Sequence, residues 1–185
     1  MKKFLHMMVA VMAIAVPSAA QATPISLNQW YTFSFGGVGS ALGDGSGVTL
    51  GVNPPAIAAP AAPWDFITLA PVQLVVSDGF NSGDQFELFD NLSSLGLTST
   101  PTGGGDCSSD ITACLADITI SKGAFILGAG SHSLTGTVAA SFSAGAGFFQ
   151  VTDVVTAVPE PVTFSIFGAG LLGAAAMRRR KAKKA

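Results

Sequence analysis

The chain of 185 residues has few charged side chains, only two cysteines and only two histidines. Charged residues make up 11% of the sequence, against about 25% in an average soluble domain. The 22 glycines follow no Gly-X-Y period, which excludes a collagen-like rod. Because 49% of the residues are apolar, the composition also argues against a wholly disordered chain. These features favour a single globular domain.

Basic residues are absent from most of the chain. Lys2 and Lys3 lie at the N-terminus and six more lie between Arg178 and Lys184, which leaves Lys122 alone in between. The same central part carries ten acidic residues and has a net charge of −9. Such a body repels phosphate backbones, which attract proteins through lysine and arginine, so we predict no nucleic-acid partner. The two basic ends need a separate explanation.

The N-terminus has the three parts of a secretory signal. Two lysines precede an apolar run over residues 4–16, and Ala20 and Ala22 give the small-x-small pattern that signal peptidase cleaves. The apolar run is shorter than the roughly 20 residues that a membrane-spanning helix needs. We therefore predict a signal helix within residues 1–22, its removal by signal peptidase, and Thr23 as the new N-terminus.

A second apolar segment lies near the C-terminus. Residues 162–177 contain no charged side chain. As a helix they would extend about 24 Å, a little short of a hydrocarbon core of about 30 Å. The basic cluster that follows would stay in the cytoplasm by the positive-inside rule, and its long side chains can snorkel to cover the missing length. We predict a transmembrane helix in the inner membrane; a core helix of the domain is the alternative, and the terminal basic cluster fits it less well.

A proline-containing triplet, Pro159-Glu160-Pro161, stands just before this segment. A signal peptide, this triplet, a short Gly/Ala/Leu helix and a terminal cluster of arginines (Arg178, Arg179, Arg180), in this order, resemble the PEP-CTERM class of bacterial exported proteins. The resemblance covers residues 158–185. It implies recognition by exosortase, a membrane-embedded, cysteine-dependent transpeptidase-like enzyme. It further implies removal of the tail and transfer to the cell surface or the extracellular polysaccharide matrix.

The triplet has a physical rationale of its own. Prolines on both sides of Glu160 fix the backbone and remove hydrogen-bond donors, so the triplet cannot join the interior of a helix or strand. It would be held extended at the outer boundary of the membrane, where a protease can read it. A plain proline-containing linker before an anchor is the alternative.

Between the two ends, alternation of apolar and polar residues is typical of β-strands. Turns rich in Gly, Asn, Asp and Ser separate the alternating segments. Short strands at this spacing predict an all-β fold, an antiparallel β-sandwich that is jelly-roll-like. The predicted strands cover residues 30–35, 73–77, 85–90, 117–121 and 133–138.

The domain organisation follows from composition. Residues 23–63 are rich in Gly, Pro and Ala, which predicts an N-terminal strand and a linker region with little room for long elements. We expect the compact β-sandwich body to start near Trp64 and to span residues 64–157. The sorting signal then occupies residues 158–185.

The two cysteines, Cys107 and Cys114, enclose six residues of a polar segment. In an exported protein such a pair predicts a disulfide. Closure of so short a loop stabilises the fold by roughly 2–3 kcal/mol at best. A metal site lacks partner ligands, and a catalytic thiol lacks a base nearby in the sequence.

Four acidic residues follow one another closely: Asp78, Asp84, Glu87 and Asp90. Hard oxygen ligands on turn segments are what Ca²⁺ requires. Turn formation explains the same residues, because Asp and Asn open turns through side-chain-to-backbone hydrogen bonds. The spacing matches no EF-hand. We expect no cofactor, with a calcium site at these four residues as the alternative.

Catalytic chemistry finds little support. After signal removal His132 is the single histidine, and no Gly-x-Ser-x-Gly elbow accompanies it. We expect His132 to lie exposed in a Gly-Ser turn rather than to act as a base. Carboxylate pairs could serve glycoside hydrolysis only in a fold that brings them together. We therefore predict that the protein is not an enzyme.

These observations predict an exported, non-catalytic component of the cell surface or of an exopolysaccharide matrix such as a biofilm, anchored transiently in the inner membrane on its way. Its partners would be signal peptidase, exosortase, the inner membrane and extracellular polysaccharide. A carbohydrate- or calcium-binding extracellular module is the alternative function, and a secreted hydrolase is a more distant one.

Overall fold

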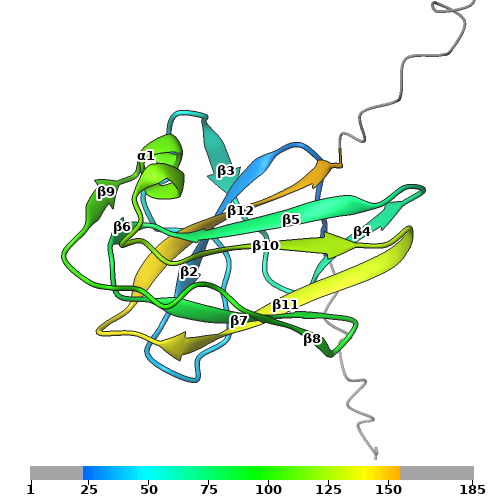
Figure 1. Cartoon of the computed structure of the whole chain (residues 1–185). Coiled ribbons are helices and arrows are strands. Elements are labelled where there is room, and N and C mark those ends of the chain that lie inside the picture. Colours follow the sequence, from blue (N-terminus) through cyan, green and yellow to red (C-terminus); the bar gives the residue numbers. More distant parts are fainter. Residues whose placement is uncertain (1–22, 155–185) are drawn as a thin grey trace, which may run out of the picture. The chain divides into compact units, whose positions relative to one another are not determined.

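The computed structural model describes residues 23–154, drawn in colour in Figure 1. The predicted signal helix (1–22) and sorting signal (158–185) lie outside the described residues. The described part is mostly β-sheet, which confirms the expected fold class at that level. In residues 23–154 no helix is long and apolar enough to cross a bilayer.

Two five-stranded sheets form the body. Sheet I has the spatial order β1-β4-β11-β7-β8, and sheet II has the order β10-β5-β12-β2-β3. Sheet I consists of β1 (Thr23–Pro24), β4 (Trp64–Thr68), β7 (Gln85–Asp90), β8 (Ser93–Leu97) and β11 (Gly130–Ala140). Sheet II consists of β2 (Trp30–Phe35), β3 (Ala56–Ala58), β5 (Val72–Asp78), β10 (Lys122–Leu127) and β12 (Gly145–Asp153). A small third sheet pairs β6 (Phe80–Asn81) with β9 (Asp106–Ser108), and α1 (Ile111–Ala116) follows β9.

Aromatic side chains from both sheets fill a shared core. Phe33 on β2 and Phe149 on β12 are fully buried, as are Trp64 on β4 and Phe86 on β7. The rings of Trp64 and Phe149 stack with centroids 4.1 Å apart, and those of Phe33 and Phe86 meet edge to face at 5.3 Å. Because each of these pairs joins a strand of sheet I to one of sheet II, the two sheets pack face to face.

A smaller apolar cluster covers part of the outer face of sheet II. Trp30 and Phe148 point away from the main core and pack against Ile111 and Cys114 of α1. The alternation within β2 therefore serves two cores, with Tyr31, Phe33 and Phe35 on one side and Trp30 on the other. In Figure 1, α1 and β9 lie together at one end of the body.

The segment before Trp64 is part of the same packed body, which corrects the prediction of a strand and linker outside a core that starts near Trp64. Leu42 and Ala59 are buried in the main core. The backbone N–H of Leu42 donates to the Gly136 carbonyl of β11, and the N–H of Gly45 donates to the Ala59 carbonyl. Tertiary hydrogen bonds thus hold a Gly/Pro-rich sequence that composition alone assigns to a linker.

The predicted strand over residues 117–121 is also wrong. Asp117 ends α1, and its side chain accepts hydrogen bonds from the backbone and hydroxyl groups of Thr119, which closes a turn. Such local bonds compete with a strand ladder. The strand β10 begins at Lys122 instead.

Candidate functional site

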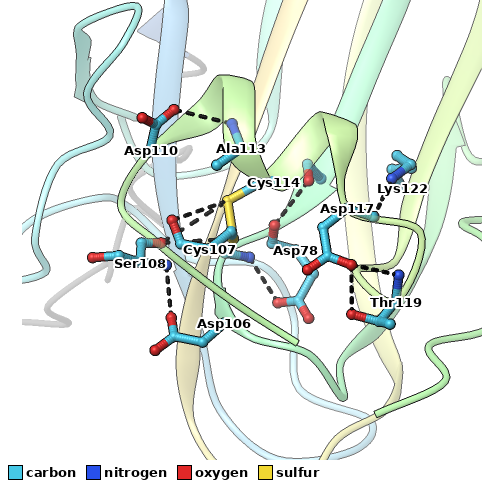
Figure 2. The surroundings of a disulfide bond; sticks show 12 residues. Asp78, Asp106, Cys107, Ser108, Asp110, Ala113, Cys114, Asp117, Thr119 and Lys122 are labelled. Atoms are coloured by element: carbon cyan, nitrogen blue, oxygen red, sulfur yellow. Dashed lines mark hydrogen bonds between the residues drawn. A yellow bond between two sulfur atoms is a disulfide. The ribbon is translucent and has the colours of Figure 1, made fainter. Parts of the chain in front are cut away.

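The disulfide predicted between Cys107 and Cys114 is confirmed, and both residues are buried (Figure 2). Cys107 lies on β9 and Cys114 on α1, with their Cα atoms 4.9 Å apart. The bridge therefore joins the helix that covers sheet II to the strand beside it. Both cysteines belong to the smaller apolar cluster, and because they are bonded to each other neither is a reactive thiol.

The helix α1 begins at the N-cap residue Asp110, which the sequence analysis did not identify as a helix start. The Asp110 side chain accepts a hydrogen bond from the backbone N–H of Ala113 at 3.0 Å and one from the Asn53 side chain at 3.1 Å. These bonds, that of Ala113 first, lower the pKa of Asp110. Aspartate is a preferred N-cap residue because its side chain accepts a hydrogen bond from a backbone N–H in the first turn of the helix. The hydrogen bond from Asn53 also fastens the start of α1 to the segment around Asn53.

Two of the four acidic residues proposed for calcium, Asp78 and Asp84, lie together. The Asp78 carboxylate is fully buried and accepts hydrogen bonds from the backbone N–H groups of Gly79 at 2.8 Å and Asp84 at 3.2 Å. Burial first, and then the nearby charge of Asp84, raise the pKa of Asp78 to about 7. Burial also raises the pKa of Asp84, against hydrogen bonds from Ser141 and Phe142.

The other two acidic residues point elsewhere. Glu87 accepts a hydrogen bond from the Ser94 hydroxyl at 2.8 Å, on the exposed side of the β7–β8 pair. Asp90 contacts His132 at the far end of β7. Within residues 23–154, no three His, Cys, Asp or Glu side chains are grouped so that they could hold a metal ion. The structure thus divides the predicted calcium ligands among three places.

His132 lies within β11 and is nearly buried, which corrects the expectation of an exposed turn residue. Its Nδ1 is 2.7 Å from Oδ2 of Asp90, and its Nε2 is 2.9 Å from the carbonyl oxygen of Gly128. The imidazole also stacks on the ring of Phe66, with centroids 4.8 Å apart. Strand pairing explains the burial, because β11 begins at Gly130 and places alternate residues of this strand against the core.

An Asp-His pair is a common catalytic arrangement, but this one has no free ring nitrogen. A carbonyl oxygen only accepts hydrogen bonds, so Nε2 of His132 carries a proton that is directed at Gly128. General-base catalysis requires the second nitrogen to face the proton that it abstracts. The pair therefore fastens β7, β11 and the β10–β11 turn to one another.

The residues predicted for export lie at or beyond the limits of the described part. Thr23, the predicted new N-terminus, starts β1 and pairs with Trp64 of β4. Ala20 and Ala22 precede the described residues, and the sorting residues follow them: Pro159, Glu160, Pro161, Arg178, Arg179 and Arg180.

Comparison with known families provides the evidence for these outer segments. A model of the PEP-CTERM protein-sorting motif matches residues 157–181. The chain carries a PEP-CTERM sorting motif. The match includes the Pro-Glu-Pro triplet and the three arginines. A PEP-CTERM motif implies export, transient membrane anchoring through the C-terminal region, and exosortase as the processing partner. No curated protein and no solved structure matched the chain.

Proposed function

We propose that the protein is a non-catalytic component of the cell surface or exopolysaccharide matrix, delivered there by its PEP-CTERM motif. The match of this motif to residues 157–181 carries the proposal. The buried disulfide supports it, because structural disulfides belong to oxidising compartments outside the cytoplasm. In this proposal residues 1–22 are the signal peptide and residues 158–185 are the sorting signal, and the body between them performs the function.

We further infer that the body is a jelly roll. The long strands in chain order are β2, β4, β5, β7, β8, β10, β11 and β12. Consecutive members of this series lie in opposite sheets, except that β7 and β8 are neighbours in sheet I. This alternation supports a chain wound as two Greek keys around one core. Many lectin and viral capsid domains have this architecture, so it is compatible with a component of a matrix. The architecture by itself assigns no activity to the protein.

The side-chain arrangement around the one histidine of residues 23–154 supports a non-catalytic role. Both ring nitrogens of His132 are engaged, and its ring is covered by Phe66. The buried carboxyl of Asp78 is held by backbone N–H groups and is fully shielded from solvent. Neither group is presented to a substrate.

One observation favours a carbohydrate-binding module as the second candidate. Along β11, Ser133, Thr135 and Thr137 are half-buried on the outer face of sheet I, and Thr135 pairs with Phe89 of β7. A row of hydroxyl groups beside an aromatic ring can hydrogen-bond and stack on a sugar. Retention of the protein on the producer's own polysaccharide, lost in Phe89→Ala, would favour this candidate.

The routing proposal is tested by the intact mass of the protein from the producing cells, in membrane and extracellular fractions. We expect an extracellular product that starts at Thr23, ends near Pro159–Pro161 and carries two hydrogens fewer than the reduced chain. Pro159→Ala combined with Pro161→Ala should leave the tail in place, whereas Pro71→Ala, at an exposed proline of the body, should be processed normally. A membrane species that still ends at Ala185 in the parent chain would overturn the proposal.

A further inference from the structure

The chain leaves the body at the end where several turns of the two sheets meet. β12 ends at Asp153, and close to this point the N–H of Asn28 donates to the carbonyl of Val151 at 2.7 Å. Figure 1 shows the end of β12 on the same side as the β4–β5 and β10–β11 turns. An open pocket of about 420 Å³ at this end is lined by residues of sheet I, including Ile67 and Ser131, and by Leu27.

Large aliphatic side chains are exposed at this end. Leu69 in the β4–β5 turn is 96% exposed and Leu92 in the β7–β8 turn is 90% exposed. Ile67 on β4 and Ile126 on β10 are 73% and 60% exposed. We call these four residues the aliphatic end. Single exposed aliphatic residues are common, but two on turns and two near the ends of the strands that lead into turns indicate an end of the body that contacts something apolar.

The aliphatic end is held in a fixed arrangement by polar contacts just beneath it. His132 joins Asp90, which precedes the β7–β8 turn, to Gly128 in the β10–β11 turn. The Asn91 side chain donates to the carbonyl of Ser131 at 3.0 Å, and Ser131 pairs with Ile67. The turns that carry Leu69 and Leu92 are therefore positioned relative to each other by strands and hydrogen bonds.

The length of chain beyond β12 limits how far this end can lie from a membrane. Residues 154–161 separate β12 from the uncharged segment 162–177. Eight residues span at most about 3.3–3.6 Å each, less than about 30 Å in total. While the C-terminal segment is anchored, the aliphatic end is thus tethered near the lipid surface at a high effective concentration. This step rests on the membrane anchoring in the proposed function.

We propose that the aliphatic end docks on the lipid surface of the inner membrane while the tail is anchored. Leu69 and Leu92 enter the boundary between headgroups and acyl chains, as apolar side chains of peripheral proteins do. Lys122, the single basic residue of the described part, lies at the opposite end of β10, where it pairs with Ser77. Asp65 instead lines the pocket beside Ile67. The charge therefore favours a zwitterionic surface over an anionic one.

The test uses the full chain in vesicles of phosphatidylethanolamine and phosphatidylcholine, with bromine atoms on the acyl chains as quenchers of tryptophan fluorescence. Leu69→Trp places a reporter at the aliphatic end. Phe142→Trp is the matched control, because Phe142 is 89% exposed and lies in the β11–β12 turn at the opposite end of both strands. The native Trp30 and Trp64 are buried, and the parent chain gives their background.

We expect the Leu69→Trp emission to shift to shorter wavelength and to lose intensity with brominated lipid, while Phe142→Trp changes little. Leu92→Trp should behave like Leu69→Trp, and agreement between them shows that the result does not come from a structural disturbance in one variant. Equal quenching at both ends, or none at Leu69→Trp, would overturn docking. Flotation of the vesicles separates the two proposals: a chain that does not float has no anchor, whereas a floating chain without selective quenching has an anchor but no docked end.

Discussion

The Nδ1 atom of His132 lies 2.7 Å from Oδ2 of Asp90, a contact between the neighbouring strands β11 and β7. Asp90 also accepts a hydrogen bond from the backbone N–H of Ser133 through its second oxygen, at 3.2 Å. One carboxylate thus fixes both the imidazole and the backbone next to it. The pair sits under the turns of the aliphatic end and determines how these turns are placed.

His132→Ala should lower the free energy of unfolding by about 2–3 kcal/mol, because it leaves a half-buried carboxylate and a carbonyl without their partner. Chemical denaturation at neutral pH measures the change. Ser131→Ala is the control on the same strand, since Ser131 is exposed, and it should alter stability by less than about 0.5 kcal/mol. Similar losses for the two variants would show that the hydrogen bonds of His132 contribute nothing specific.

Stability should fall as the pH rises from about 4 to 7, because of Asp78. Its pKa is raised from 3.8 to about 7 in the folded protein, first by burial and then by the charge of Asp84. Between these two values the folded state keeps a proton that the unfolded state has released, so each rise in pH favours unfolding. The stabilisation is complete below pH 3.8 and is lost as the pH passes about 7.

Asp78→Asn should flatten this dependence in a series of thermal melts between pH 4 and 8. Asp84, whose pKa is raised in the same direction, leaves a smaller residual slope. Asp44→Asn is the control, because hydrogen bonds from the side chain and backbone of Ser46 lower the pKa of that exposed carboxyl. An unchanged slope in Asp78→Asn would contradict the assignment.

Replacing both Cys107 and Cys114 by serine should lower the free energy of unfolding by about 2–3 kcal/mol, the loop-closure value for so short a loop. The main core should persist, because the bridge touches only the smaller cluster. Hydrogen exchange can separate the two effects: amides of α1 should exchange faster, while those of β7 and β11 keep their protection. Loss of protection throughout the body would show that the bridge supports the whole fold.

Gly45→Ala should destabilise the protein by about 1–3 kcal/mol or more, because overpacked sites cannot accept an added methyl group. A Cβ atom at this position would lie 2.0 Å from the carbonyl oxygen of Thr32 and 2.7 Å from the backbone nitrogen of Ala59. At Gly37 a Cβ atom would meet nothing within 4 Å, so Gly37→Ala is the control. Equal melting temperatures would mean that the segment before Trp64 is less firmly packed than the structure indicates.

Local pattern was enough to predict several parts of the fold. The strands at residues 30–35 and 85–90 have the predicted bounds, because their aromatic and aliphatic residues alternate cleanly. The disulfide followed from two cysteines in an exported chain. In each case the signal lies within a few neighbouring residues.

Other features depend on contacts distant in sequence. The backbone of Gly45 bonds to Ala59, and that of Leu42 to Gly136, so a Gly/Pro-rich segment joins the body in a way that its composition does not reveal. His132 is buried because β4 and β7 both pair with β11 near it. The acidic residues of 78–90 separate for the same reason, since β7 carries Glu87 and Asp90 away from Asp78. The N-cap of α1 at Asp110 is, by contrast, a local signal in the sequence that the prediction did not include.

The outermost strands of the sheets have a consequence for molecules crowded side by side on a surface. β1 and β3 form one edge of each sheet, contain two and three residues, and run parallel to their neighbours. An open edge of normal length is a template on which a second chain can add strands. Along these two edges only a few backbone N–H and C=O groups are available to pair with a strand of a neighbouring copy. If copies are crowded together, the bodies would therefore stay separate at these two edges.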